Sequence, residues 1–134
     1  SSDLTLNGRA IHVSHVAEIR KALAATGFGY DRHEQPEHYV AYLQEFLRDS
    51  QDIRRGGCAS LDMCWVACGR YDLYFEENLH PWDTAAGLLI LEEAGGKLTD
   101  YQGGEYQITA PSIAATNRIL HDQTLSILAR VRQK

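Results

Sequence analysis

The sequence predicts an α/β domain in which a mixed, mostly parallel sheet is covered by helices on both faces. Short apolar segments alternate along the chain with longer segments whose apolar residues recur at helical spacing. Such alternation is typical of strand–helix–strand units, which bury both faces of a sheet. A length of 134 residues and a hydrophobic content of 44% fit a single domain over residues 1–134 with its own core.

The first third of the chain is expected to hold a hairpin, a short helix, a buried strand and an amphipathic helix. An Asn-Gly pair at residues 7–8, between partly alternating segments, is typical of a hairpin turn. Ser14 is expected to cap a short helix that ends at Lys21. The apolar run at residues 23–28 is typical of a buried strand. Helical spacing of apolar residues then predicts a helix with one face formed by Tyr39, Leu43, Phe46 and Leu47.

The rest of the chain continues the alternation. Strands are predicted at residues 52–55, 71–76, 97–100 and 112–116. Helices are predicted at residues 61–68, from Asp83 to the glycine pair 95–96, and after Asn117. A glycine pair is a common helix stop. Because residues 85–91 are uninterruptedly apolar, the helix that starts near Asp83 is expected to be buried.

Composition excludes several classes of partner. A net charge of −5 argues against nucleic acid or an anionic membrane as an electrostatic partner, but bound cations can still attract a small phosphorylated substrate. No stretch has the length of a transmembrane helix. The three cysteines are odd in number and crowded together, at Cys58, Cys64 and Cys68. A disulfide framework is therefore not expected, and a reduced, cytoplasmic setting fits better.

Asp83 is the residue with the most chemical information. It follows Pro81, which interrupts the preceding segment, and directly precedes the apolar run. One interpretation is an N-cap or first-turn residue that stabilises the helix by ~1 kcal/mol. The other is a metal ligand at the mouth of a pocket, with Trp82 packed behind it. Spacing alone leaves both open.

A resemblance favours the metal. The segments WDTAAG at residues 82–87 and EEAGGKLTD at residues 92–100 resemble the carboxy-terminal signature of the inositol monophosphatase family. This family belongs to the metal-dependent, lithium-sensitive sugar and inositol phosphatases. The Asp of its Trp-Asp pair is a ligand of the catalytic metals. The resemblance therefore implies that Asp83 binds Mg²⁺.

The resemblance also implies substrate contacts. Glu76 falls where the family has a carboxylate that accepts hydrogen bonds from ring hydroxyls; the alternative is a solvated strand end. The segment at residues 57–60 falls on a family segment whose backbone touches the substrate, which implies contacts from Gly57, Cys58 and Ala59. Cys58 departs from the hydroxyl residue that is usual there.

The family's other metal ligands come from an upstream Glu and an Asp-Pro-Ile/Leu-Asp-Gly-Thr motif, and this sequence contains neither. The resemblance thus covers nearly all of this chain but only the carboxy-terminal half of the family's domain pair. A start at Ser1 without an initiating Met favours a fragment of a longer enzyme, with the amino-terminal half as its partner.

The implied function is that of the substrate-binding, metal-completing half of a Mg²⁺-dependent phosphatase. Its substrate would be a small phosphate monoester of a polyol or sugar, such as inositol monophosphate. The half is expected to be inactive alone, and the family resemblance implies a homodimer. The alternative is a non-catalytic binding or assembly module that retains the fold.

Overall fold

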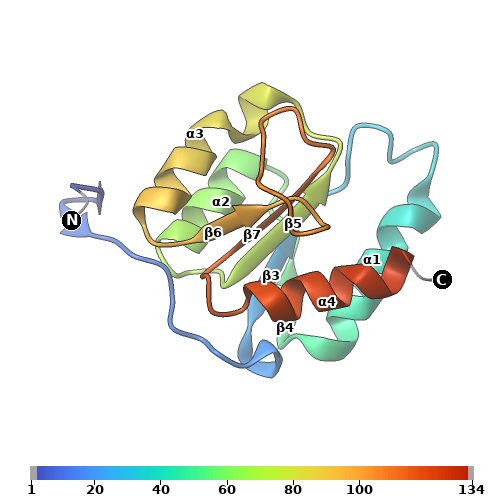
Figure 1. Ribbon diagram of the computed structural model, residues 1–134, viewed down its shortest axis with the longest axis horizontal. Coiled ribbons are helices and arrows are strands. Elements are labelled where there is room, and N and C mark those ends of the chain that lie inside the picture. Colours follow the sequence, from blue (N-terminus) through green and yellow to red (C-terminus); the bar gives the residue numbers. More distant parts are fainter. Residues whose placement is uncertain (1–2, 133–134) are drawn as a thin grey trace.

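The computed structural model describes residues 3–132. The expected domain of residues 1–134 includes four terminal residues, Ser1 among them, that lie outside this described part. Figure 1 shows a layered molecule with a central sheet between pairs of helices. The central sheet has five strands in the order β4-β3-β5-β7-β6. In chain order these strands are β3 (Leu23–Thr26), β4 (Asp52–Arg54), β5 (Leu73–Glu77), β6 (Lys97–Thr99) and β7 (Ser112–Thr116).

The sheet is mixed. β3 pairs in parallel with β4 and β5, whereas β7 is antiparallel to both β5 and β6. Because only β7 is reversed, four of the five strands run in the same direction. All five residues of β7 are buried, as expected for a strand covered on both faces. The predicted mixed, mostly parallel sheet is therefore confirmed.

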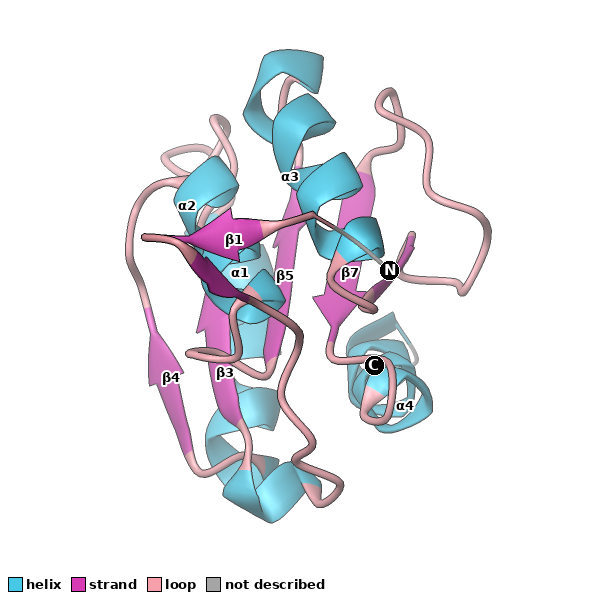
Figure 2. Cartoon of the chain, turned by 90° about the vertical axis from the view of Figure 1, so that its left-hand side faces the viewer, coloured by secondary structure: helices cyan, strands magenta, loops and turns pink. Residues whose placement is uncertain are grey.

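Helices cover both faces of the sheet, as predicted. On one face lie α1 (Pro36–Asp49) and α4 (His121–Arg132), and on the other lie α2 (Ala59–Ala67) and α3 (Pro81–Glu93), as Figures 1 and 2 show. Successive side chains of β5 alternate between the faces, so Tyr74 enters one core and Phe75 the other. The stacked rings of Phe46 and Phe75, 4.1 Å apart, join α1 to the sheet.

The amino-terminal segment agrees only in part with prediction. The hairpin forms, with β1 (Thr5–Leu6) antiparallel to β2 (Arg9–Ala10). The short helix after Ser14 does not; only a 3₁₀ turn, η1 (Ile19–Lys21), is present. Ser14 instead donates its hydroxyl proton to Asp72 Oδ1 and accepts a hydrogen bond from Asn117. Tertiary hydrogen bonds thus take the side chain that would have capped the helix.

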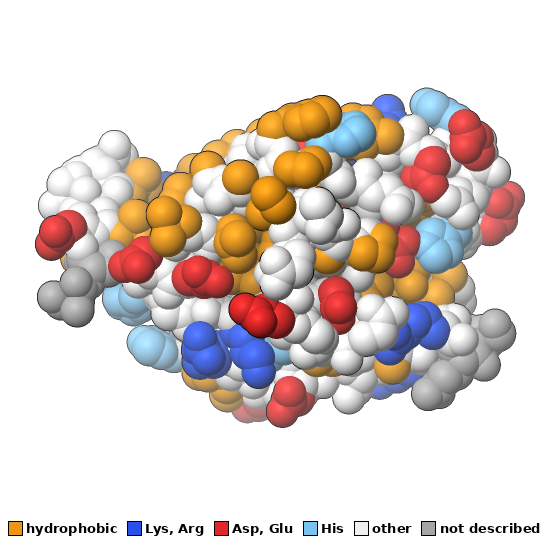
Figure 3. Space-filling model, turned by 45° about the horizontal axis from the view of Figure 1, so that its top comes forward, with side chains coloured by type: hydrophobic (Ala, Val, Ile, Leu, Met, Phe, Trp, Pro, Cys, Tyr) orange, Lys and Arg blue, Asp and Glu red, His pale blue; other side chains and the backbone are white. Residues whose placement is uncertain are grey.

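The burial of α3 was overestimated. The helix packs on α2 through Thr84, Gly87 and Leu91, but Ala85, Ala86 and Leu89 are exposed. A single neighbouring layer can cover only one side of a helix, whatever its sequence. Figure 3 shows hydrophobic side chains gathered over this part of the surface. Among the described residues, no helix is both long and apolar enough to cross a bilayer.

Candidate active site

A pocket of about 330 Å³ lies where the carboxyl ends of β3 and β5 meet the amino-terminal ends of α2 and α3. Ligands of open α/β sheets commonly bind at this edge, because loops and helix termini converge there. The pocket is lined by Phe28, Tyr30, Arg32, Arg55, Gly57, Cys58, Ala59, Ser60, Glu76, Leu79, Trp82 and Asp83. The structure therefore brings together all five residues that the sequence nominated: Asp83, Glu76, Gly57, Cys58 and Ala59.

Asp83 lies in the first turn of α3 and is not its N-cap residue. The helix begins two residues earlier, at Pro81, with His80 as the N-cap. Proline suits this first position because it has no N–H to leave unpaired. The Asp83 carboxylate accepts a hydrogen bond from the His80 backbone N–H at 2.9 Å through Oδ2, as in a capping box. Asp83 therefore closes the helix end and also faces the pocket.

Glu76 is a buried carboxyl group, not a solvated strand end. Its exposed fraction is only 7%. The Tyr74 hydroxyl donates a hydrogen bond to Oε2 at 3.0 Å. Burial, together with nearby Asp62, raises the pKa of Glu76 to about 7, although the Tyr74 hydrogen bond and Arg55 oppose the shift. Glu76 can thus change its charge near neutral pH.

Gly27 makes room for Glu76, a role that the sequence motifs do not predict. A β-carbon on Gly27 would lie 1.4 Å from Glu76 Oε1 and 2.6 Å from its Cδ. No rearrangement short of moving the glutamate could accommodate it. The only local signal was a glycine directly after a buried strand, which often marks the close approach of another group.

The amino-terminal end of α2 forms another side of the pocket. Cys58 is the N-cap residue, is exposed, and lies 3.4 Å from the Ser60 hydroxyl through its sulfur. The pKa of its thiol is lowered, chiefly by that hydrogen bond and then by the Leu61 backbone N–H. Nearby, the Arg55 guanidinium lies over the ring of Phe28, 5.2 Å from its centroid. This side of the pocket therefore presents hydrogen-bond donors and one cation.

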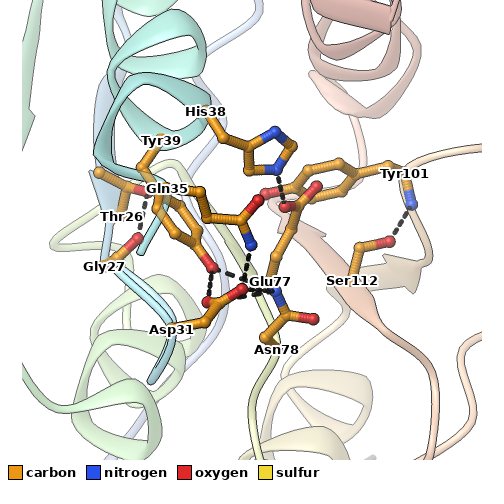
Figure 4. A network of polar contacts seen from close by, with 10 residues as sticks. All are labelled: Thr26, Gly27, Asp31, Gln35, His38, Tyr39, Glu77, Asn78, Tyr101 and Ser112. Carbon is orange, nitrogen blue, oxygen red and sulfur yellow. Dashed lines mark hydrogen bonds and ion pairs between the residues drawn. The ribbon is translucent and has the colours of Figure 1, made fainter. Parts of the chain in front are cut away.

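The loop between β3 and α1 is tied to the connection between β5 and α3, as Figure 4 shows. Asp31 accepts hydrogen bonds from the Tyr39 hydroxyl, the Gln35 amide and, at 3.2 Å, the Asn78 amide. Nearby, His38 pairs with Glu77. Sequence analysis gave no hint of this network, because its members come from separate segments of the chain.

The capacity for metal binding rests on Asp83. Carboxylate oxygens are ligands that Mg²⁺ prefers, and Asp83 presents them at the pocket. Within residues 3–132, no three His, Cys, Asp or Glu side chains are grouped so that they could hold a metal ion together. Asp83 is thus suited to complete a metal site that has further ligands.

The buried state of Glu76 predicts a pH-dependent stability. Its folded pKa of about 7 exceeds the ordinary value of 4.5, so the folded chain favours the neutral acid. The unfolding free energy from this group is fully present below pH 4.5 and is lost as the pH rises through about 7. We expect Glu76→Gln, which stays neutral, to stabilise the chain by ~1–3 kcal/mol at about pH 8 and little at about pH 5.

Urea unfolding at the two pH values measures this effect. Glu105→Gln is the matched control, because Glu105 is exposed and its replacement should change both stabilities equally little. An equal effect of Glu76→Gln at the two pH values would contradict a buried, neutral Glu76.

Fold and pocket together define an α/β domain with a pocket at the carboxyl ends of β3 and β5. Comparison with known proteins identifies the family. The sequence profile of the inositol monophosphatase family matches residues 2–133. The chain belongs to the inositol monophosphatase family, which confirms the resemblance inferred from its motifs.

The relatives are phosphatases and SuhB proteins. The chain is 42% identical to Arabidopsis thaliana "Phosphatase IMPL1, chloroplastic", over 92% of this chain and 33% of that protein. It is 44% identical to a Neisseria meningitidis "Putative Nus factor SuhB", over 92% of this chain and 48% of that protein. The solved inositol monophosphatase from Anabaena superposes with a TM-score of 0.88 at 44% identity, covering 92% of this chain and 49% of that one. The chain thus spans half or less of the length of these relatives.

Proposed function

We propose that this chain is the substrate-binding, metal-completing half of a Mg²⁺-dependent phosphatase that hydrolyses a small phosphate monoester, such as inositol monophosphate or a sugar phosphate. The observation that carries the proposal is the convergence of Asp83, buried Glu76 and the α2 terminus on one pocket. Family membership supports the reaction class. Within the described residues no set of three metal ligands forms, which supports the expectation that the chain is inactive alone.

Each side of the pocket has a role in this proposal. Asp83 would hold Mg²⁺ through its carboxylate, and the metal would supply the activation of water and the stabilisation of the leaving group. Glu76, in its charged form, accepts hydrogen bonds from the hydroxyls of the polyol or sugar. The backbone at Gly57, Cys58 and Ala59 contacts the substrate from the α2 side. Since Glu76 is held by Tyr74 and Gly27, its direction is set before the substrate binds.

The remaining ligands would come from an amino-terminal half. The exposed apolar side chains on α2 and α3 support a partner on this face: Leu61, Trp82 and Leu89 are 46%, 75% and 61% exposed. A helix that is apolar on all sides is ordinarily buried. Asp83 lies at the start of the same helix, so a partner on this face would reach the metal site. A homodimer, lithium sensitivity and a cytoplasmic location are further proposals that rest on the family resemblance alone.

A binding or assembly module is the second candidate. It is favoured by relatives whose names are those of Nus factors, among them the SuhB proteins of Neisseria meningitidis and Escherichia coli. In this alternative the fold is kept but Asp83 serves only the end of α3. The two candidates differ in whether the chain can support turnover once a complementary half is present.

A complementation assay tests the proposal. The isolated chain, assayed with Mg²⁺ and inositol monophosphate, is expected to show no appreciable turnover, because a lone Asp binds Mg²⁺ weakly. Addition of the amino-terminal half of a related inositol monophosphatase is expected to produce turnover. The same mixture made with Asp83→Asn is the control and should stay inactive. Robust turnover by the isolated chain would show that the metal assignment is wrong. Absence of turnover in the mixture would favour the binding or assembly module.

A further inference from the structure

Tyr30 is a pocket residue to which neither the motifs nor the proposed function assigns a role. It lies on the loop between β3 and α1, and 57% of its surface is exposed. Exposed tyrosines commonly leave their hydroxyl in water. Here the hydroxyl instead donates to the Asp83 carboxylate, at 3.0 Å from Oδ2 and 3.3 Å from Oδ1. The contact spans 53 residues of sequence, so it is a product of the fold.

The two oxygens of Asp83 are held differently. Oδ2 accepts from both the His80 backbone N–H at 2.9 Å and the Tyr30 hydroxyl at 3.0 Å. Among residues 3–132, the only hydrogen-bond contact of Oδ1 is the longer one with the same hydroxyl. Two donors on one oxygen restrict the rotation of the carboxyl group, whereas the other oxygen of this pocket-lining residue has only the weaker contact. Such an arrangement suits a carboxylate that gives one oxygen to a cation.

The ring of Tyr30 is held by stacking. It lies 4.6 Å from the ring of His80, and His80 in turn stacks on Trp82 at 4.4 Å. His80 and Trp82 flank the first residue of α3, so the stack joins the loop to the same helix end that carries Asp83. Aromatic rings at such separations attract one another, so the stack restrains the position of the Tyr30 ring. The hydroxyl therefore approaches Asp83 from a restrained direction.

The backbone beside Tyr30 is anchored as well. The next residue, Asp31, accepts hydrogen bonds from Tyr39 of α1 and from Asn78 (Figure 4). Asn78 belongs to the connection that leads from β5 into α3, and it also donates to the Tyr39 hydroxyl at 3.0 Å. Loop and helix end are thus joined twice, through Asp31–Asn78 and through Tyr30–Asp83. The Asp31–Asn78 link holds the two segments together independently of Tyr30, so the Tyr30–Asp83 hydrogen bond is more than an isolated surface contact.

We propose that Tyr30 is a positioning residue, whose hydroxyl holds the Asp83 carboxylate through Oδ2 so that Oδ1 is oriented to bind a divalent cation. This inference rests on the proposed function, in which Asp83 is a metal ligand. Residues that hydrogen-bond to a metal ligand typically increase the metal affinity by roughly 10-fold to 100-fold.

Nuclear magnetic resonance with Mn²⁺ as the probe tests the proposal on the 134-residue chain itself. A cation at Asp83 broadens the backbone amide signals of the first turn of α3, those of Asp83 and Thr84 above all. In Tyr30→Phe, which keeps the ring and its stacking, half-maximal broadening is expected to need roughly 10-fold more Mn²⁺. Tyr71→Phe removes the hydroxyl of a tyrosine that does not line the pocket and should leave the titration unchanged.

The outcomes separate this inference from the proposed function. Equal titrations for wild type and Tyr30→Phe, both with local broadening at α3, would overturn the role of Tyr30 while leaving Asp83 a metal ligand. No local broadening in the wild type at millimolar Mn²⁺ would overturn the positioning role in this chain, and the metal assignment of Asp83 would then be decided by the complementation assay with Asp83→Asn. A thermal melt of each variant shows whether the fold is kept, and a Tyr30→Phe melt close to wild type with weakened Mn²⁺ binding is the result we expect.

Discussion

Asp83→Asn is expected to abolish most activity in a phosphatase that contains this half together with its amino-terminal partner, while the fold survives. The substitution removes the negative charge on which a hard divalent cation depends. Replacing a residue that only positions a metal ligand typically lowers metal affinity or activity by roughly 10-fold to 100-fold. Loss of the ligand itself should therefore lower turnover at ordinary Mg²⁺ by at least on the order of 100-fold. The Asn oxygen can still accept the His80 N–H, so stability should change by no more than ~0.5 kcal/mol.

Asp83→Ala is the companion variant. It should lose as much activity and, because it leaves the His80 N–H without its acceptor, destabilise the chain by ~1 kcal/mol besides. Turnover measured against Mg²⁺ concentration, with a thermal melt of each variant, separates the two roles of the carboxylate. Near-normal turnover of the Asn variant would mean that Asp83 only closes the helix end, and the central assignment would fail.

Gly27→Ala is expected to displace Glu76 and to damage both stability and substrate binding. The new methyl group would occupy the place of Glu76 Oε1, so the carboxyl must leave its pocket and its hydrogen bond with Tyr74. Overpacking of this kind costs ~1–3 kcal/mol. Loss of one charged hydrogen bond to a substrate hydroxyl should raise KM by roughly 10-fold in the complete enzyme. Urea unfolding and steady-state kinetics measure the two effects.

A double-mutant cycle tests the cause. In a Glu76→Ala background the carboxyl that obstructs the methyl group is absent, so Gly27→Ala should cost ~1 kcal/mol less than in the wild type. A cost that is equal in both backgrounds would show that Gly27 is required for its own backbone and not for Glu76. The cycle needs only the isolated chain, since the measured quantity is its unfolding free energy.

The family, the alternation of strands and helices, and the motif that carries Asp83 can all be predicted from the amino-acid sequence. These properties depend on short segments or on residues that recur at fixed spacing, so they can be predicted without knowledge of the tertiary contacts. The glycine pair ends α3 where expected, with Ala94 as its C-cap and Gly95 at a positive φ of 91°. Although β7 runs antiparallel to its neighbours, the sheet is mostly parallel, as predicted.

Tertiary structure alone decided which groups those elements bring into contact. The expected helix after Ser14 is missing because Asp72 and Asn117 bind its cap residue from distant segments. Likewise, the apolar run of α3 is partly exposed, because burial depends on what covers a helix and not on its composition.

The site shows the same division. Asp83 and Glu76 were found from motifs, but the burial that raises the pKa of Glu76 arises only when the strands assemble. The close approach of Gly27 to Glu76 and the Tyr30–Asp83 hydrogen bond each join residues about 50 positions apart. Hydrogen bonding and packing depend on distance in space, whereas motifs record only distance along the chain. The residues with chemistry were therefore predictable, and the residues that hold them in place were not.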